Sequence, residues 1–150
     1  MKFVIQRVSH SSVTVNNEVI GNINKGFMVL IGVEDADTEA IADKMVSKLV
    51  NMRVFEDENG KMNLALKDVG GELLLISQFT LYADCKKGNR PSFTGAGKPD
   101  YANKMYEYII DKCKQDIEVV ETGEFGADMK VELLNDGPVT IILDSREIIG

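Results

Sequence analysis

Two short runs of consecutive apolar residues constrain the fold of this chain more than any other feature. The first, Phe27-Met28-Val29-Leu30-Ile31, is closed by Gly26 and Gly32, and the second opens the segment ELLLISQFTLY at residues 72–82. A strand with one face in water alternates apolar and polar residues, so an uninterrupted run of this length predicts a strand buried on both faces. We therefore predict two buried strands, the second over residues 73–82, with other elements packed around them.

The segment between these runs changes to helical spacing. Asp37 is expected to cap a helix there, and Glu39 in its first turn complements the helix dipole. Pro99, which suits the first helical position, predicts the start of a second helix. The residues expected on the buried faces of the two helices are Ile41, Met45, Leu49 and Met52, and then Ala102, Met105, Ile109 and Cys113.

The remaining apolar segments are predicted to be strands joined by turns. Residues 2–8 and 12–24 are expected to be strands, with a turn at Asn16-Asn17, and Asn59-Gly60 is a second turn signal. Two last strands, at 129–134 and 139–143, are joined by Asn135-Asp136-Gly137-Pro138. We find no repeat or linker, so residues 1–150 are predicted to form a single α+β domain: a curled antiparallel or mixed β-sheet, barrel-like, packed with two or three α-helices.

Composition narrows the classes of function. No apolar run approaches the roughly 20 residues of a membrane span, and the N-terminus lacks the apolar block of a signal peptide, so a cytoplasmic protein with two reduced thiols is expected. The net charge of −7 argues against broad, sequence-blind nucleic-acid binding. It leaves room for a protein that grips only the end of an RNA, although the basic cluster Lys86, Lys87, Arg90 and Lys98 is, by pattern alone, more often a solvated loop.

The usual catalytic side chains are scarce. His10 is the only histidine, in a polar HSSV segment expected to be a surface turn, so a histidine metal site cannot be built. A nucleophile–histidine pair would need that one residue as its base. The cysteines lack metal-ligand spacing, and no phosphate-binding glycine loop is present. We expect no metal and no cofactor.

Two polar interruptions remain as candidate sites. Ser77-Gln78-Phe79-Thr80 places two hydroxyls and an amide at the end of a buried strand, where they either face a cavity or mark the point at which the strand reaches solvent. Gly137-Pro138 follows an Asp-Gly hairpin signal; the proline removes a backbone donor and fixes φ. Physical reasoning alone would leave the second segment as a turn.

These same segments carry a family resemblance. SQFTLY at 77–82, KGNRPSF at 87–93 and NDGPVT at 135–140 resemble the signature blocks of the D-aminoacyl-tRNA deacylase family. The opening MKFVIQRVSHSSVTV and the stretch NMRVFEDENGKMN resemble the N-terminal half of the same family, and the similarity runs in order along essentially the whole chain. It departs at residues 93–97, where a more alanine-rich run is expected.

The resemblance implies a homodimeric hydrolase of D-aminoacyl-tRNA and mischarged glycyl-tRNA, with two active sites at the subunit interface. Gly137 and Pro138, joined by a cis bond, would enter the partner's site as a filter against L-residues, with Arg7 holding their loop. Ser77, Gln78, Phe79 and Thr80 would form the catalytic wall. The basic residues expected to contact the tRNA acceptor end are Lys86, Lys87 and Arg90.

Two versions of the hydrolysis are open. Thr80 could be a nucleophile, or water could attack while backbone amides and Gln78 stabilise the oxyanion. The second is favoured because no base is evident. Rival readings of the whole chain are a non-catalytic dimeric binding module and a general esterase that needs no tRNA.

Overall fold

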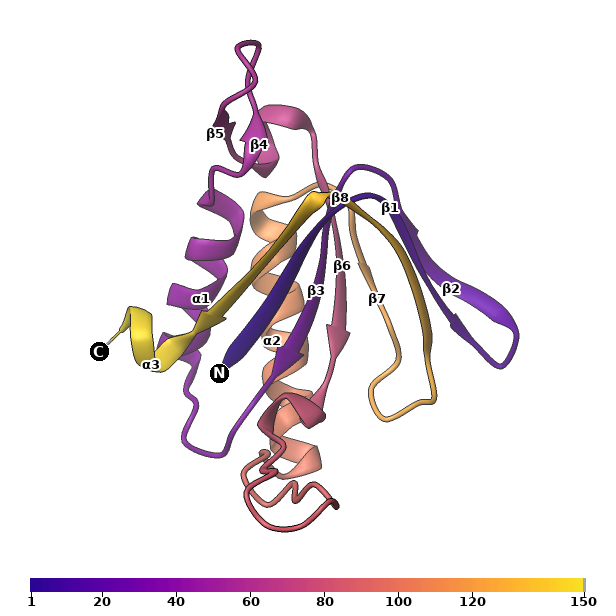
Figure 1. Ribbon diagram of the computed structural model, residues 1–150, viewed down its shortest axis with the longest axis vertical. Coiled ribbons are helices and arrows are strands. Elements are labelled where there is room, and N and C mark those ends of the chain that lie inside the picture. Colours follow the sequence, from indigo (N-terminus) through magenta and orange to yellow (C-terminus); the bar gives the residue numbers. More distant parts are fainter. Residues whose placement is uncertain (150) are drawn as a thin grey trace.

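The central strands of the sheet are the two apolar runs. The computed structural model describes residues 1–149 (Figure 1), and in it β3 (Gly26–Gly32) and β6 (Glu72–Ser77) pair in parallel. All of β3 except Leu30 is buried. The prediction of two buried strands is confirmed, but the second ends at Ser77 and not at Tyr82. The last hydrogen bond to β3 is donated by the Gln78 amide to the Ile31 carbonyl, at 2.8 Å. Beyond it the chain leaves the sheet, and residues Phe79–Tyr82 form a short 3₁₀ helix, η2.

The N-terminal segment is one long strand and a hairpin. β1 (Lys2–Val15) runs without a break through residues 9–11, so the predicted interruption there is wrong, and His10 lies exposed on a strand instead of in a turn. β2 (Glu18–Ile23) returns antiparallel to the second half of β1. The turn at Asn16-Asn17 is confirmed: both residues have positive φ, 50° and 64°, as tight hairpin turns require.

The C-terminal half of the sheet differs most from the prediction. β8 (Lys130–Asp144) is a single strand that pairs antiparallel with β1 along nearly its whole length. The predicted pair of last strands joined at 135–138 is therefore wrong. The register shifts there, since Gln6 pairs with Thr140 and Val8 with Asn135. β8 thus advances five residues while β1 advances two, and the extra residues bulge out of the ladder.

Two helices cover one face of the sheet (Figure 1). α1 (Glu39–Asn51) is capped by Thr38, whose Oγ1 accepts from the Ile41 amide at 3.2 Å. The expected cap, Asp37, lies one residue before the true cap, and its side chain is buried. Its carboxylate accepts hydrogen bonds from the Met1 amino group and the Glu34 amide, both at 2.8 Å. α2 (Pro99–Asp116) begins at the proline as predicted.

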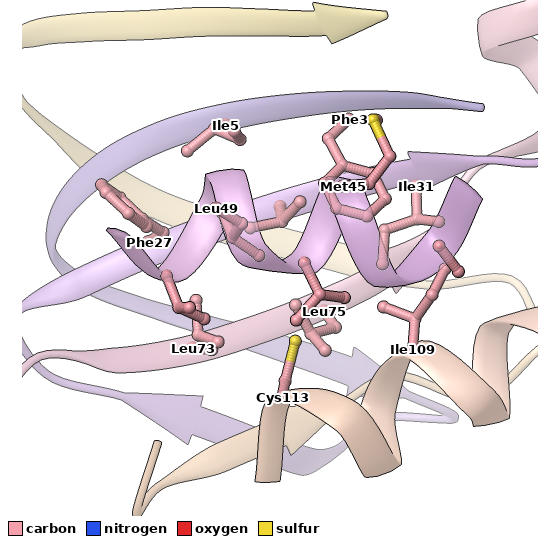
Figure 2. Packing of buried hydrophobic residues seen from close by; sticks show 14 of the residues in the cluster. Phe3, Ile5, Phe27, Ile31, Met45, Leu49, Leu73, Leu75, Ile109 and Cys113 are labelled. Atoms are coloured by element: carbon pink, nitrogen blue, oxygen red, sulfur yellow. The ribbon is translucent and has the colours of Figure 1, made fainter. Parts of the chain in front are cut away.

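The main core lies between these helices and the sheet. Figure 2 shows Met45 and Leu49 of α1 and Ile109 and Cys113 of α2 directed toward the strands. Phe27 also stacks on Phe55, with ring centroids 5.1 Å apart. Of the residues predicted on the buried helix faces, Ile41 and Met52 are only half-buried and the others are buried.

The smaller elements complete a single compact α+β domain. β4 (Phe55–Glu56) and β5 (Met62–Leu64) form a hairpin around the turn predicted at Asn59-Gly60, and η1 (Leu66–Val69) follows. The short α3 (Ser145–Ile148) comes after β8. β7 (Val120–Thr122) pairs parallel to β6 and approaches β2, where the Asn22 amide lies 3.4 Å from the Glu121 carboxylate. The mixed sheet is therefore nearly closed, which confirms the predicted fold class. Within residues 1–149, no helix is long and apolar enough to cross a membrane.

Candidate active site

A cleft of about 730 Å³ opens where β6 ends. Its walls come from the end of β6, the segment that leads into α2, and the connection between β7 and β8. Apolar side chains dominate its lining. The residues that line it are Ile31, Val33, Ile76, Ser77, Gln78, Phe79, Phe93, Thr94, Ala96, Gly97, Lys98, Pro99, Ala102, Phe125, Gly126, Ala127, Asp128, Met129 and Val131.

The polar segment after β6 forms one wall of this cleft. Ser77, Gln78 and Phe79 line it, while Thr80 lies just outside and accepts a hydrogen bond from Gln78 Nε2 to its Oγ1 at 2.6 Å. The first N–H groups of a helical turn have no partner within that turn, so the amides of Phe79 and Thr80 remain available at the start of η2. Both alternatives for this segment hold in part, because Ser77, Gln78 and Phe79 line a cleft while Phe79 and Thr80 are also exposed to solvent. The side chain of Gln78 and the amide of Phe79 are hydrogen-bond donors at this wall of the cleft.

The cleft contains little acid–base chemistry. Within residues 1–149, Lys98 and Asp128 are the only ionisable residues that line it, and both are exposed. Asp128 already pairs with Lys130 at 3.1 Å. Among the described residues no cluster of three or more metal-ligating side chains occurs.

The cleft also uses residues that sequence reasoning missed. Phe125 and Met129, from the β7–β8 connection, form an apolar wall opposite the end of β6. Tyr106 of α2 supports this wall: its ring lies 6.3 Å from that of Phe125, and its hydroxyl donates to the Leu75 carbonyl at 2.6 Å. Burial raises the pKa of Tyr106 to about 12, so the hydroxyl remains a neutral donor. The sequence feature that could have indicated this wall is the segment EFGADM at residues 124–129, which contains both Phe125 and Met129.

The loop between η2 and α2 is tied down at both ends. Asp84 and Ser92 exchange two backbone hydrogen bonds of 2.7 and 2.8 Å, and the Gly97 amide donates to the Val33 carbonyl at 2.8 Å. The three predicted RNA-contacting residues project from this loop into solvent. None of them takes part in an ion pair within residues 1–149; they are Lys86, Lys87 and Arg90.

Gly137 and Pro138 form the tip of the bulge in β8. Their peptide bond is cis, and Gly137 has φ +128°, a conformation that L-residues rarely adopt. Arg7 is only 5% exposed and donates to the Asp136 carbonyl at 3.1 Å and to the Val54 carbonyl at 2.6 Å. Asn135 braces the other side, since its Oδ1 accepts from the Val139 amide at 3.1 Å. The expected contact between Arg7 and this loop is present, and Asn135 is a second brace that sequence reasoning missed.

The bulge does not reach the cleft of its own chain. Arg7 pairs with Phe27, which pairs with Leu73, whereas Ser77 lies four residues farther along β6. With strands about 4.8 Å apart and a rise of about 3.3 Å per residue, the bulge and Ser77 are separated by about 20 Å along the surface of the sheet. Neither Gly137 nor Pro138 lines the cleft, and both are exposed. In Figure 1 the β4–β5 hairpin, beside which Arg7 holds the bulge, and the loop around η2 lie at opposite ends of the molecule.

Two bacterial proteins that share one name are similar to this chain along nearly its whole length. A protein of Clostridioides difficile (strain 630), named D-aminoacyl-tRNA deacylase, is 57% identical over 147 residues, 98% of this chain and 99% of that protein. A protein of the same name from Thermosipho melanesiensis is 51% identical over 149 residues, 99% of each chain.

Solved structures agree on the fold. One titled c-Myc DNA Unwinding Element Binding Protein superposes with a TM-score of 0.90 at 42% identity, covering 96% of this chain and 98% of that one. A probable eukaryotic D-amino acid tRNA deacylase has a TM-score of 0.80 at 17% identity and covers 95% and 97%, which supports the fold alone. The family model described as D-Tyr-tRNA(Tyr) deacylase matches residues 4–144, and this chain therefore belongs to that family.

Proposed function

We propose that the cleft binds the 3′ aminoacyl end of a tRNA and hydrolyses its ester when the amino acid is a D-residue or glycine, in a site that a second copy of the chain completes. Family membership supplies the reaction class, which is hydrolysis of the D-aminoacyl-tRNA ester. The observation that carries the rest is that the Gly137-Pro138 bulge does not line the cleft of its own chain, from which it is separated by about 20 Å along the sheet. A two-fold dimer would bring one protomer's Gly137-Pro138 to its partner's cleft.

The bulge has the properties that a test of handedness needs. Arg7 and Asn135 fix its backbone from two sides, so the carbonyl groups at its tip are stiff. A stiff backbone wall would clash with the side chain of an L-residue whatever that side chain is, whereas a D-residue would direct its side chain away. Such a clash costs several kcal/mol, more than the ~1–3 kcal/mol by which a pocket discriminates one methylene. Glycine has no side chain to reject and would be accepted.

For the hydrolysis itself, attack by water fits the cleft better than covalent catalysis. A hydroxyl nucleophile needs a base, and no histidine or carboxylate accompanies Thr80; its recorded partner is the Gln78 amide group. The amides of Phe79 and Thr80, together with Gln78, would stabilise the oxyanion, and the 2′-hydroxyl of the terminal ribose would assist.

Thr80→Ala separates these two mechanisms. We expect the variant to retain substantial deacylation, within about tenfold of wild type, because the amide at position 80 survives the substitution. Single-turnover rates with D-aminoacyl-tRNA give the measurement, and thermal unfolding checks the fold. Complete loss of turnover in a folded variant that still binds tRNA would favour covalent catalysis by Thr80.

Recognition of tRNA would be confined to its acceptor end. Three unpaired cations project from the anchored loop beside the cleft, whereas the chain as a whole carries a net charge of −7. A protein with this charge distribution attracts phosphates locally and repels them elsewhere. Lys86, Lys87 and Arg90 are thus the proposed phosphate contacts, in a cytoplasmic enzyme that works on charged tRNA.

The decisive experiment compares ester loss from D- and L-aminoacyl-tRNA for wild type and Pro138→Ala. Wild type should hydrolyse the D-ester and spare the L-ester. Pro138→Ala should reduce the ratio of the two rates by about tenfold or more, because alanine does not fix φ and the wall loosens. No release of either amino acid by wild type would favour a non-catalytic binding module. Hydrolysis of simple esters that lack the ribose, as fast as of tRNA, would identify a general esterase.

A further inference from the structure

Two phenylalanine rings stand at the rim of the cleft with much of their surface in water. Phe79 is 54% exposed and Phe93 is 39% exposed, while both line the cleft. Their centroids are 5.1 Å apart and the rings meet edge to face at 74°. In this geometry the ring that presents its edge keeps both of its faces clear of the other, so an aromatic surface is open to a ligand.

The pair is held in place by the backbone. Phe93 directly follows Ser92, which is bonded to Asp84 by two backbone hydrogen bonds, and the Ala96 amide donates to the Phe93 carbonyl at 3.1 Å. Four residues after Phe93, Gly97 is bonded to Val33, and a Cβ at Gly97 would lie 3.1 Å from the Val33 carbonyl oxygen. Phe79 is set by the first turn of η2. The exposed rings therefore belong to an anchored surface.

Cations flank Phe93 along the sequence of this loop. The loop carries Lys86, Lys87 and Arg90 before Phe93 and Lys98 after it, all exposed, in a chain that is otherwise strongly acidic. Exposed aromatic rings next to a run of cations are the combination that binds single-stranded nucleic acid: the rings stack on bases while the cations contact phosphates.

We propose that the Phe79–Phe93 pair is a stacking platform for the base that precedes the terminal adenosine of the substrate. The inference rests on the proposed function. The terminal nucleoside carries the ester and must enter the cleft for the ester to reach Ser77 and Gln78, so the next base along the strand is the one left at the rim. Stacking accepts any base, so this subsite would read the presence of a base and not its identity.

Short substrates test the platform directly. We compare kcat/KM for D-alanyl esters of adenosine, of the dinucleotide CpA, and of a dinucleotide that lacks the first base. For wild type we expect the CpA ester to be about tenfold better than the other two, and exchange of the cytosine for uracil or adenine to change little. Equal kcat/KM for all three esters would overturn the inference while leaving the proposed function intact. If wild type hydrolyses none of them, nor D-aminoacyl-tRNA, the proposed function itself fails.

Three substitutions of Phe93 distinguish stacking from packing. Phe93→Ala and Phe93→Leu should both lower kcat/KM for the CpA ester about tenfold, and Phe93→Tyr should retain the wild-type value, because only tyrosine keeps an aromatic face. The losses of kcat/KM caused by removal of the base and by Phe93→Ala should not add, since each change removes the same contact. Leucine behaving as wild type, additive losses, or an oligomeric state altered by Phe93→Ala in sedimentation would each overturn the inference in favour of a packing or interface role.

Discussion

Gly137→Ala should lower kcat/KM for D-aminoacyl-tRNA by at least about 100-fold. At φ +128° an alanine is strained by its own backbone, and its Cβ would lie 2.9 Å from Arg7 Nη2 and 2.9 Å from Val139 Cγ2. The bulge must shift to relieve these contacts, and a misplacement of about 1 Å at a positioning wall costs on the order of 100-fold in rate. Deacylation kinetics at saturating and limiting substrate give the measurement.

Gly70→Ala is the matched control. Gly70 also has a positive φ, 62°, but an added Cβ there meets nothing within 4 Å. It follows η1 at the opposite end of β6 from Ser77 and does not line the cleft. We expect it to lower the stability by about 1 kcal/mol and to leave kcat/KM within twofold. Comparable losses of activity in the two variants would show that the bulge has no specific role.

A mixed dimer of Gln78→Ala and Gly137→Ala chains should recover about half of the wild-type activity, although each variant alone is nearly inactive. If each site takes its cleft from one chain and its bulge from the other, the mixed dimer contains one site built wholly from unaltered parts. Removal of an oxyanion donor costs about 100-fold or more, so the recovered activity stands far above the background. Co-expression with two different affinity tags isolates the mixed species.

The control for this experiment pairs a wild-type chain with a chain that carries both substitutions. With shared sites, each cleft of that dimer is defective, either in its own Gln78 or in the bulge it receives, so almost no activity should remain. Complete sites within single chains predict the reverse: half activity for the control and none for the mixed dimer. A monomeric protein in sedimentation would also contradict the shared site.

The elements of this fold that could be predicted from the sequence are those whose structure depends on residues close to them in the chain. Uninterrupted apolar runs predicted β3 and β6, and apolar residues at helical spacing predicted α1 and α2. The Asn16-Asn17 pair predicted the first turn. The cap of α1 was missed by one residue because Asp37 is used by partners that are distant in sequence, above all Met1.

The C-terminal strand shows where local signals fail. Asn135-Asp136-Gly137-Pro138 has the composition of a hairpin turn, yet β1 continues past it and pairs with both flanking segments, so the chain keeps its direction and only bulges. Pairing with a strand about 130 residues earlier in the sequence decides this outcome. The cleft wall at Phe125 and Met129 was missed for a similar reason, since its role depends on the approach of β7 to β6.

Arg7 recognises the main chain at two places, 54 and 136, that are more than 80 residues apart in sequence. Its closest bonds are to carbonyl oxygens, which every amino acid possesses. These two hydrogen bonds do not depend on the identity of the side chains at positions 54 and 136, although Val54 is itself buried and the Asp136 carboxylate lies 3.7 Å from Arg7 Nε. An insertion or deletion that displaces either carbonyl would remove one of the two bonds by which Arg7 joins the segments. One guanidinium group therefore couples the backbone positions of two segments that are remote in sequence.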